Sequence, residues 1–153
     1  MKSLMIIILT SMCVMVPVLA QQSEQESSAV EPKVRFAPLH IYLDTGNRPL
    51  AAFQFELKAA AGQIKIVGVE GGQHKAFKEA PYYDPAALAN DRIIIAAFNT
   101  SHDLPKGRTR IATIHLQITG DVEPEYELNL TVAADADGKE LPAKIGFERG
   151  DRK

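Results

Sequence analysis

Three short stretches of the sequence carry residue types that could do chemistry. The first, Ser101-His102-Asp103, holds the nucleophile, base and acid types of a hydrolase triad. A working triad draws its base and its orienting acid from separate segments that converge in space, and neighbours along one chain cannot converge in that way. The Gly-x-Ser-x-Gly turn that exposes a nucleophilic serine is also absent from the sequence. We therefore interpret this stretch as a polar loop and expect no catalytic residue in it.

The second stretch, Asp135-Ala136-Asp137-Gly138, resembles half of a calcium-binding loop. Aligning its glycine with that of the loop puts Ala133 at the first ligand position and Lys144 at the last, where carboxylates are required. Asp-Gly between two alternating segments is instead typical of a hairpin turn, because both central residues tolerate a positive φ. We predict a hairpin, and keep three residues as a weak calcium candidate: Asp135, Asp137 and Glu140.

The third stretch, residues 71–89, is the longest one without clear alternation of apolar and polar residues. Long loops on a rigid scaffold often carry binding surfaces. Tyr82 and Tyr83 lie within it and could present flat rings to a sugar or to a protein partner. The alternative is that one or both rings cap the end of the folded core. These two tyrosines are the ligand-binding candidates of the sequence.

Histidine and cysteine offer little further chemistry. The histidines (His40, His74, His102 and His115) are far apart, and none is paired at metal-ligand spacing. The single cysteine, Cys13, excludes a disulfide framework and a zinc site built on several thiolates. We expect solvated histidines, no metal site and no cofactor.

The overall composition narrows the function classes. A chain of 153 residues is one domain's worth, and its 17 Lys+Arg against 19 Asp+Glu give a net charge of −2. This balance provides neither the basic surface that nucleic acid requires nor a polybasic membrane patch. There is no tryptophan, so the strongest stacking platform for sugars is missing.

The N-terminus carries a targeting pattern. Lys2 is followed by an apolar stretch from Leu4 to Ala20 that Pro17 interrupts and that ends in small residues. This is typical of a secretory signal peptide over residues 1–20, cut after Ala20, rather than of a membrane span. We therefore expect a secreted or periplasmic protein with no membrane span after cleavage. Residues 21–33 are polar and predict a disordered leader, and residues 150–153 predict a frayed tail.

Residues 34–149 must supply the scaffold, and their dominant period is two. In one segment Ala51, Phe53, Phe55 and Leu57 share one face, and polar residues share the other. Strict alternation of this kind predicts antiparallel strands with one face on a core. Turn residues separate the segments, which predicts an all-β fold: a two-layer antiparallel β-sandwich of jelly-roll type with about eight strands. The expected strands are one or two in 34–43, then 50–58, 63–70, 92–98, 109–119, 126–133 and 143–149.

Three of these segments carry a resemblance. The alternating segment Ala51–Leu57, the segment Gly107–Ile118 and the hairpin Ala134–Gly138 with its following strand are similar to strands of the cohesin domain and of related bacterial carbohydrate-binding modules. Tyr83-Asp84-Pro85 follows a later strand than the Tyr-Asp-Pro of cohesins does. The resemblance implies a cohesin-like β-sandwich, and no partner-contacting residue carries over from it.

These observations favour a non-catalytic binding or assembly module. It would recognise a protein partner through a sheet face or through the 71–89 loop. The alternative is a carbohydrate-binding module, which requires exposed aromatic rings. An enzyme such as a glycosidase with a carboxylate pair is the third hypothesis, but most acidic residues fall on polar strand faces or in turns.

Overall fold

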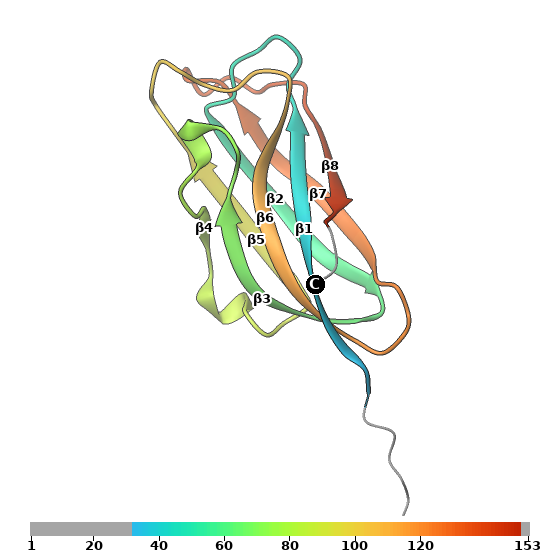
Figure 1. Cartoon of the computed structure of the whole chain (residues 1–153). Coiled ribbons are helices and arrows are strands. Elements are labelled where there is room, and N and C mark those ends of the chain that lie inside the picture. Colours follow the sequence, from blue (N-terminus) through green and yellow to red (C-terminus); the bar gives the residue numbers. More distant parts are fainter. Residues whose placement is uncertain (1–31, 151–153) are drawn as a thin grey trace, which may run out of the picture. The chain divides into compact units, whose positions relative to one another are not determined.

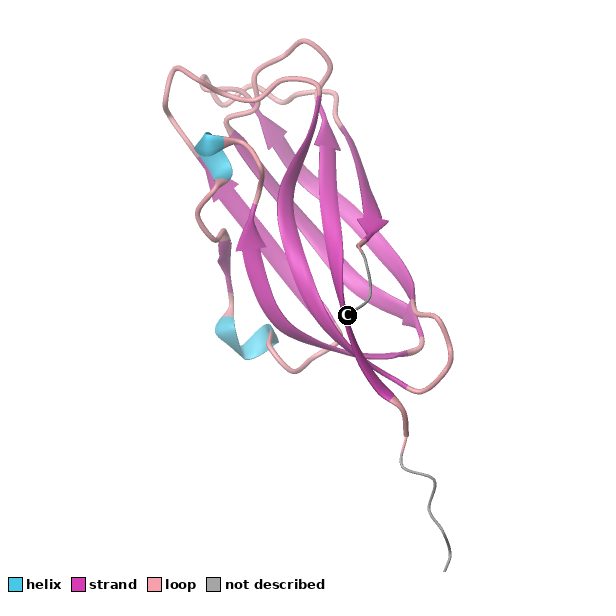
Figure 2. Ribbon diagram, in the orientation of Figure 1, coloured by secondary structure: helices cyan, strands magenta, loops and turns pink. Residues whose placement is uncertain are grey.

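The computed structural model describes residues 32–150, which form two four-stranded sheets (Figures 1 and 2). The predicted signal peptide, nearly all of the predicted leader and residues 151–153 lie outside the described residues. The elements in chain order are β1 (Val34–Asp44), β2 (Ala52–Ala61), β3 (Gln63–Gly71), η1 (Lys75–Phe77), β4 (Tyr82–Tyr83), η2 (Pro85–Ala87), β5 (Arg92–Phe98), β6 (Arg108–Thr119), β7 (Glu125–Ala134) and β8 (Lys144–Arg149).

The strands pair antiparallel within two separate layers. The order is β3-β6-β1-β8 in one sheet and β4-β5-β2-β7 in the other. This confirms the predicted all-β, two-layer antiparallel fold with eight strands. The eighth strand is not a second strand within 34–43, because that segment forms β1 alone; it is the short β4 inside the predicted 71–89 loop. That loop also contains the two 3-10 turns η1 and η2.

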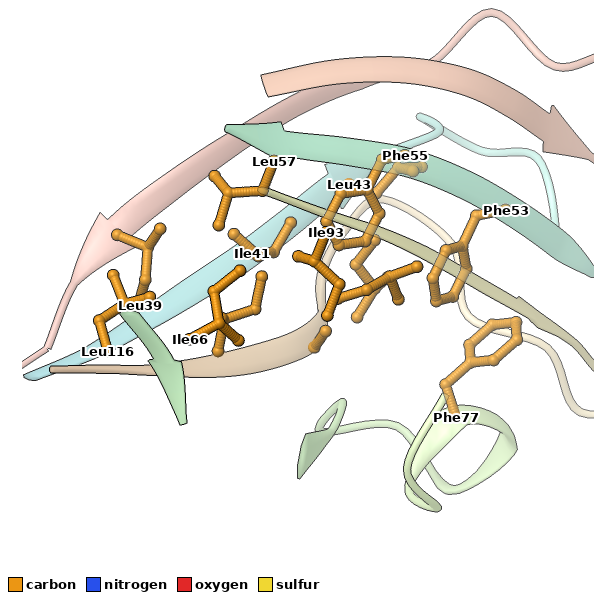
Figure 3. Packing of buried hydrophobic residues seen from close by; sticks show 14 of the residues in the cluster. Leu39, Ile41, Leu43, Phe53, Phe55, Leu57, Ile66, Phe77, Ile93 and Leu116 are labelled. Atoms are coloured by element: carbon orange, nitrogen blue, oxygen red, sulfur yellow. The ribbon is translucent and has the colours of Figure 1, made fainter. Parts of the chain in front are cut away.

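The period-two residues meet between the sheets, as predicted. Phe53, Phe55 and Leu57 of β2 are at most 2% exposed and belong to the same core cluster as Leu116 of β6, which is equally buried (Figure 3). Burial of apolar side chains contributes about 25 cal/mol per Å² of apolar surface removed from water. Alternating apolar residues therefore fix which face of each strand turns inward.

The alternation fails at bulges, where one strand gains a residue. Thr131 in β7 is opposite no residue of β2 in the strand register, since Gln54 pairs with Val132 and Phe55 with Leu130. An extra residue exchanges the two faces of a strand beyond it. Alternation along Tyr126, Leu128 and Leu130 predicts that Val132 also faces the core. This prediction is wrong, because Val132 is 41% exposed and Ala133 takes the inward position.

The two flanks of the sandwich are closed differently. The covered flank is formed by the β3 and β4 edges together with residues 72–90, which pack Phe77 against Phe53 with ring centroids 5.1 Å apart. A Cβ on Gly71 would lie 2.1 Å from the carbonyl oxygen of Lys78, so only glycine permits this close approach. The open flank is formed by the β7 and β8 edges, where the inward-facing side chains are only half-buried: Tyr126, Leu128, Leu130, Ile145 and Phe147.

Candidate functional site

The two tyrosines predicted to bind a ligand lie on opposite sides of their strand. Tyr82 pairs with Ala96 and Tyr83 with Ile95, and successive side chains of an extended strand point to opposite faces. Tyr82 therefore projects from the outer face of its sheet and is 69% exposed. Tyr83 turns inward and packs against the hydrophobic core. Only the first ring is fully available to a partner.

The exposed ring of Tyr82 has an aromatic neighbour. Its centroid lies 6.1 Å from that of Phe98 on β5, and the two ring planes are 11° apart. Phe98 is 66% exposed, and Ile94 on the same outer face is 46% exposed. We call these three residues and the small Ala96 between them the apolar patch: Tyr82, Ile94, Ala96 and Phe98.

A hollow of about 540 Å³ opens beside the apolar patch. Its floor is β5, and its wall is the segment from β4 to η2. The wall is held in place because the Asp84 side chain accepts a hydrogen bond of 2.9 Å from the backbone N–H of Ala86. The lining residues are Tyr82, Tyr83, Asp84, Ala86, Ala87, Arg92, Ile93, Ile94 and Ala96.

The polar groups around the apolar patch are engaged with one another. Arg92 donates to the carboxylate of Glu56, and this bond lowers the pKa of Glu56 and raises the pKa of Arg92. On the other side of the patch, the side-chain amide of Gln54 donates to Thr131 Oγ1 at 3.1 Å. The patch is thus an apolar surface bordered by polar side chains that already have partners.

The predicted loop containing Ser101, His102 and Asp103 shows no triad geometry. Ser101 Oγ donates to the backbone oxygen of Asp103. The carboxylate of Asp103 instead pairs with Lys75 at 2.5 Å, and this bond lowers its pKa. The other carboxylate oxygen of Asp103 lies 3.8 Å from Nε2 of His74, and Nδ1 of that ring accepts from the backbone N–H of Ala76. Both nitrogens of this ring thus face groups other than the Ser101 hydroxyl.

The fold brings together two histidines that are far apart in the sequence. On the outer face of the β3-β6-β1-β8 sheet, His40 pairs in register with Thr113 and His115 with Pro38. His40 Nδ1 lies 3.0 Å from Thr113 Oγ1, and burial followed by the charge of Arg110 lowers the pKa of His40. Thr113 is only 3% exposed, so its hydroxyl is not accessible to a substrate.

The hairpin predicted at Asp135–Gly138 forms, with Gly138 at φ +77°. Asp135 Oδ1 accepts from the backbone N–H groups of Asp137 and Lys139, and its other oxygen lies 3.4 Å from Arg48. The carboxylate of this calcium candidate thus closes its own turn. Within residues 32–150 no group of three or more His, Cys, Asp or Glu side chains is placed to hold a metal ion.

The residues that the sequence reasoning missed are Ile94 and Phe98. The run Ile93-Ile94-Ile95 is apolar on both faces, which predicts a strand inside a sheet. β5 does lie inside its sheet, but its outer face stays largely in solvent, where Ile94 is 46% exposed. One sequence signal for the exposed face was available. Ile94, Ala96 and Phe98 occupy every second position, alternating with the buried Ile93 and Ile95, so they share the opposite face of the strand.

Comparison with known proteins identifies no relative. No family model matches the chain, and no curated protein or solved structure is significantly similar to it. Among the residues that the structure describes, no helix is long and apolar enough to cross a membrane.

Proposed function

We propose that this chain is a non-catalytic binding module of cohesin-like type that recognises a protein partner through the apolar patch. The observation that carries the proposal is the pair of exposed rings on a sheet face, Tyr82 and Phe98, beside a hollow of about 540 Å³. Contiguous exposed apolar side chains bordered by polar residues are typical of protein–protein interaction sites. Aromatic residues are also enriched at the centres of such interfaces.

The patch is built on a firmly anchored strand, which suits a binding surface. β5 pairs with β2 along Arg92–Phe98, and the inward neighbours Ile93 and Ile95 are anchored in the core. A partner would therefore meet preordered side chains and would pay little conformational entropy to order them. No acid, base and nucleophile converge in the hollow, whose only charged lining residues are Asp84 and Arg92.

A polysaccharide is the alternative ligand, because two nearly parallel exposed rings also suit the flat face of a sugar. The polar groups nearby argue for a protein instead. Sugar recognition needs free hydrogen-bonding groups beside the rings. Here Arg92 and Glu56 pair with each other, as do Gln54 and Thr131. A partner that supplies mainly apolar contacts fits the patch better.

The proposed location is the periplasm or the cell exterior, which rests on the N-terminal targeting pattern of the sequence. A partner is therefore to be sought among periplasmic and culture-supernatant proteins. The likeness of three strand segments to cohesin domains supports the same class of function, since cohesins are assembly modules.

Substitution on the patch tests the proposal. The protein is used to capture partners from periplasmic and supernatant fractions, and the affinity for a captured protein is then measured by calorimetry. Tyr82→Ala and Phe98→Ala are each expected to weaken binding by about 2 kcal/mol, roughly thirtyfold, because truncating an interface aromatic has this effect at a hot spot.

The matched control is Phe36→Ala, which removes another exposed aromatic ring, 53% exposed, from the other sheet. It should leave affinity unchanged. Equal loss in all three variants, or none in the two patch variants, would refute the assignment of the patch. Retention on insoluble polysaccharides that depends on Tyr82 would favour the carbohydrate alternative, and turnover of glycosides or esters would refute the non-catalytic assignment.

A further inference from the structure

The four outer edges of the two sheets differ in how they are protected from pairing with another chain. An unpaired strand edge presents backbone N–H and C=O groups that can bind a further strand, and proteins usually cover, shorten or charge such edges. The β3 edge is covered: Ile66 donates its N–H to the carbonyl oxygen of Asn90 at 2.9 Å and accepts from Ala89 at 2.7 Å. β4 is only two residues long.

The β8 edge is protected by its length and charge. It has six residues, and both of its ends are cationic, with Lys144 at the start and Arg149 at the end. Glu148 adds a further charge. A second strand laid along it would have to approach these charged groups closely.

β7 is longer than β8, and its only charged residues are Glu125 and Glu127 near its start. It has ten residues and contains no Lys, Arg or Pro. β2 pairs with one side of it. On the other side, residues 139–141 cover only the last two residues of β7, where Leu141 donates its N–H to the carbonyl oxygen of Ala133 at 2.8 Å. Within the described sheets, the segment from Glu125 to Val132 therefore has one edge without a strand partner.

Side chains at this edge would gain burial from another strand. Tyr126, Leu128 and Leu130 point inward but are only half-buried, because they lie on the open flank next to β8. A strand added to β7 would extend the sheet past them. Apolar surface that is now partly in water would then be removed from it.

We infer that the β7 edge pairs antiparallel with the β7 edge of a second copy of this chain. A two-fold axis at Leu128 places Glu127 opposite Asn129 of the second copy and Glu125 opposite Thr131. No carboxylate then faces a carboxylate, whereas a parallel pairing would set like charges side by side, which destabilises a strand pair. The same register keeps Tyr126 and Leu130 on one face, which is the inner face of both sandwiches.

The inferred dimer also affects recognition, in a way that rests on the proposed function of the apolar patch. The two sheets join into one of eight strands, with an isologous interface at the centre. The two-fold axis is perpendicular to the joined sheet, so both apolar patches face the same side. A partner with two matching sites would be held bivalently.

Self-association is tested on the full chain, as recovered from the producing cell, by sedimentation velocity over a range of concentrations. The wild type should show a concentration-dependent dimer. Leu128→Lys, which places an inward charge at the edge, should weaken self-association by at least roughly tenfold. Val67→Lys places the same charge on an exposed position of the covered β3 edge and should leave the dimer unchanged.

Disulfide trapping checks the register without relying on a destabilising charge. With Cys13→Ser removing the only native cysteine, Leu128→Cys should form an intermolecular disulfide on mild oxidation, because the axis sets this residue against its own equivalent. Val67→Cys should not. A wild type that stays monomeric, a dimer indifferent to Leu128→Lys, or an edge occupied by a different polypeptide would each overturn the inference. Loss of partner binding in Tyr82→Ala with the dimer intact keeps the two proposals distinguishable.

Discussion

The covered flank and the open flank close the same core by different means. On the covered flank, residues 72–90 leave the sheets, insert Phe77 against Phe53 and bond to the β3 edge at Ile66. On the open flank, the two sheets end at β7 and β8 with no segment between them, and Phe147 and its neighbours remain half-buried. The contrast shows that an irregular loop can bury the edge of a sandwich more completely than a regular edge strand does, because the loop contributes a side chain of its own to the core.

The largest expected effect comes from removing the side chain that fills the covered flank. Phe77 is 4% exposed. Phe77→Ala should lower the free energy of unfolding by about 3–5 kcal/mol, since it leaves a cavity as well as losing buried surface. Phe147→Ala on the open flank should cost less, about 1–2 kcal/mol, because part of that ring is already in water.

Urea unfolding followed by far-UV circular dichroism measures both values. Phe77→Leu, which keeps most of the volume, is the control for simple loss of aromaticity and should recover much of the stability. Equal losses for the two alanine variants would mean that the flanks are closed equally well.

A backbone substitution probes the same difference with a smaller expected effect. Gly71→Ala introduces a Cβ 2.1 Å from the carbonyl oxygen of Lys78, so backbone must shift, at about 1–3 kcal/mol. Gly146→Ala on β8 places its Cβ in open space, with nothing within 4 Å, and should be close to neutral. The thermal unfolding midpoints of the two variants give the comparison. An unchanged midpoint for Gly71→Ala would show that the backbone of residues 72–90 moves away from the new Cβ at little cost.

A pH titration sharpens the description of the open flank. Burial raises the pKa of Tyr126 above its usual value of about 10. The neutral phenol is thus favoured in the folded state, so the stability that it contributes is present below pH 10 and is lost as the pH rises through the higher folded pKa. Tyr126→Phe should remove this part of the alkaline decline in unfolding free energy. An unchanged decline would mean that water reaches this ring freely.

The smallest expected effect concerns His40, on the outer face beside the end of β8. Burial lowers its pKa below the usual 6.5. The neutral ring is favoured in the folded state, so its contribution to stability is present above pH 6.5 and is lost as the pH falls through the lowered folded pKa. His40→Asn should flatten the unfolding free energy between neutral and mildly acidic pH, and a slope identical to the wild type would contradict the assignment.

Alternation along the chain was sufficient to predict the fold class and the core, because a strand with one buried face repeats its apolar residues every second position. It placed Phe53, Phe55 and Leu57 correctly. It could not predict the exchange of faces at Thr131, since a bulge depends on how β7 meets β2 and leaves no mark in either strand alone. β4 was not predicted either, because a strand of two residues is too short to show a period.

The candidate site was half predictable. Tyr82 and Tyr83 were found from loop position and ring chemistry, but only pairing with β5 decides that the first ring faces outward. Phe98 ends a segment predicted only as a strand, 92–98, and its stacking on Tyr82 joins residues that are 16 positions apart. Such a contact follows from strand register, which local sequence does not specify.

The way β8 ends has a mechanical consequence. Its last residues run antiparallel to β1, and Gly150 donates its N–H to the carbonyl oxygen of Pro38, near the strand's beginning at Val34. Tension applied through these two points would peel β8 away from β1 one hydrogen bond after another, instead of loading the whole ladder at once. In a chain of linked modules under load, this domain would therefore be among the first to yield.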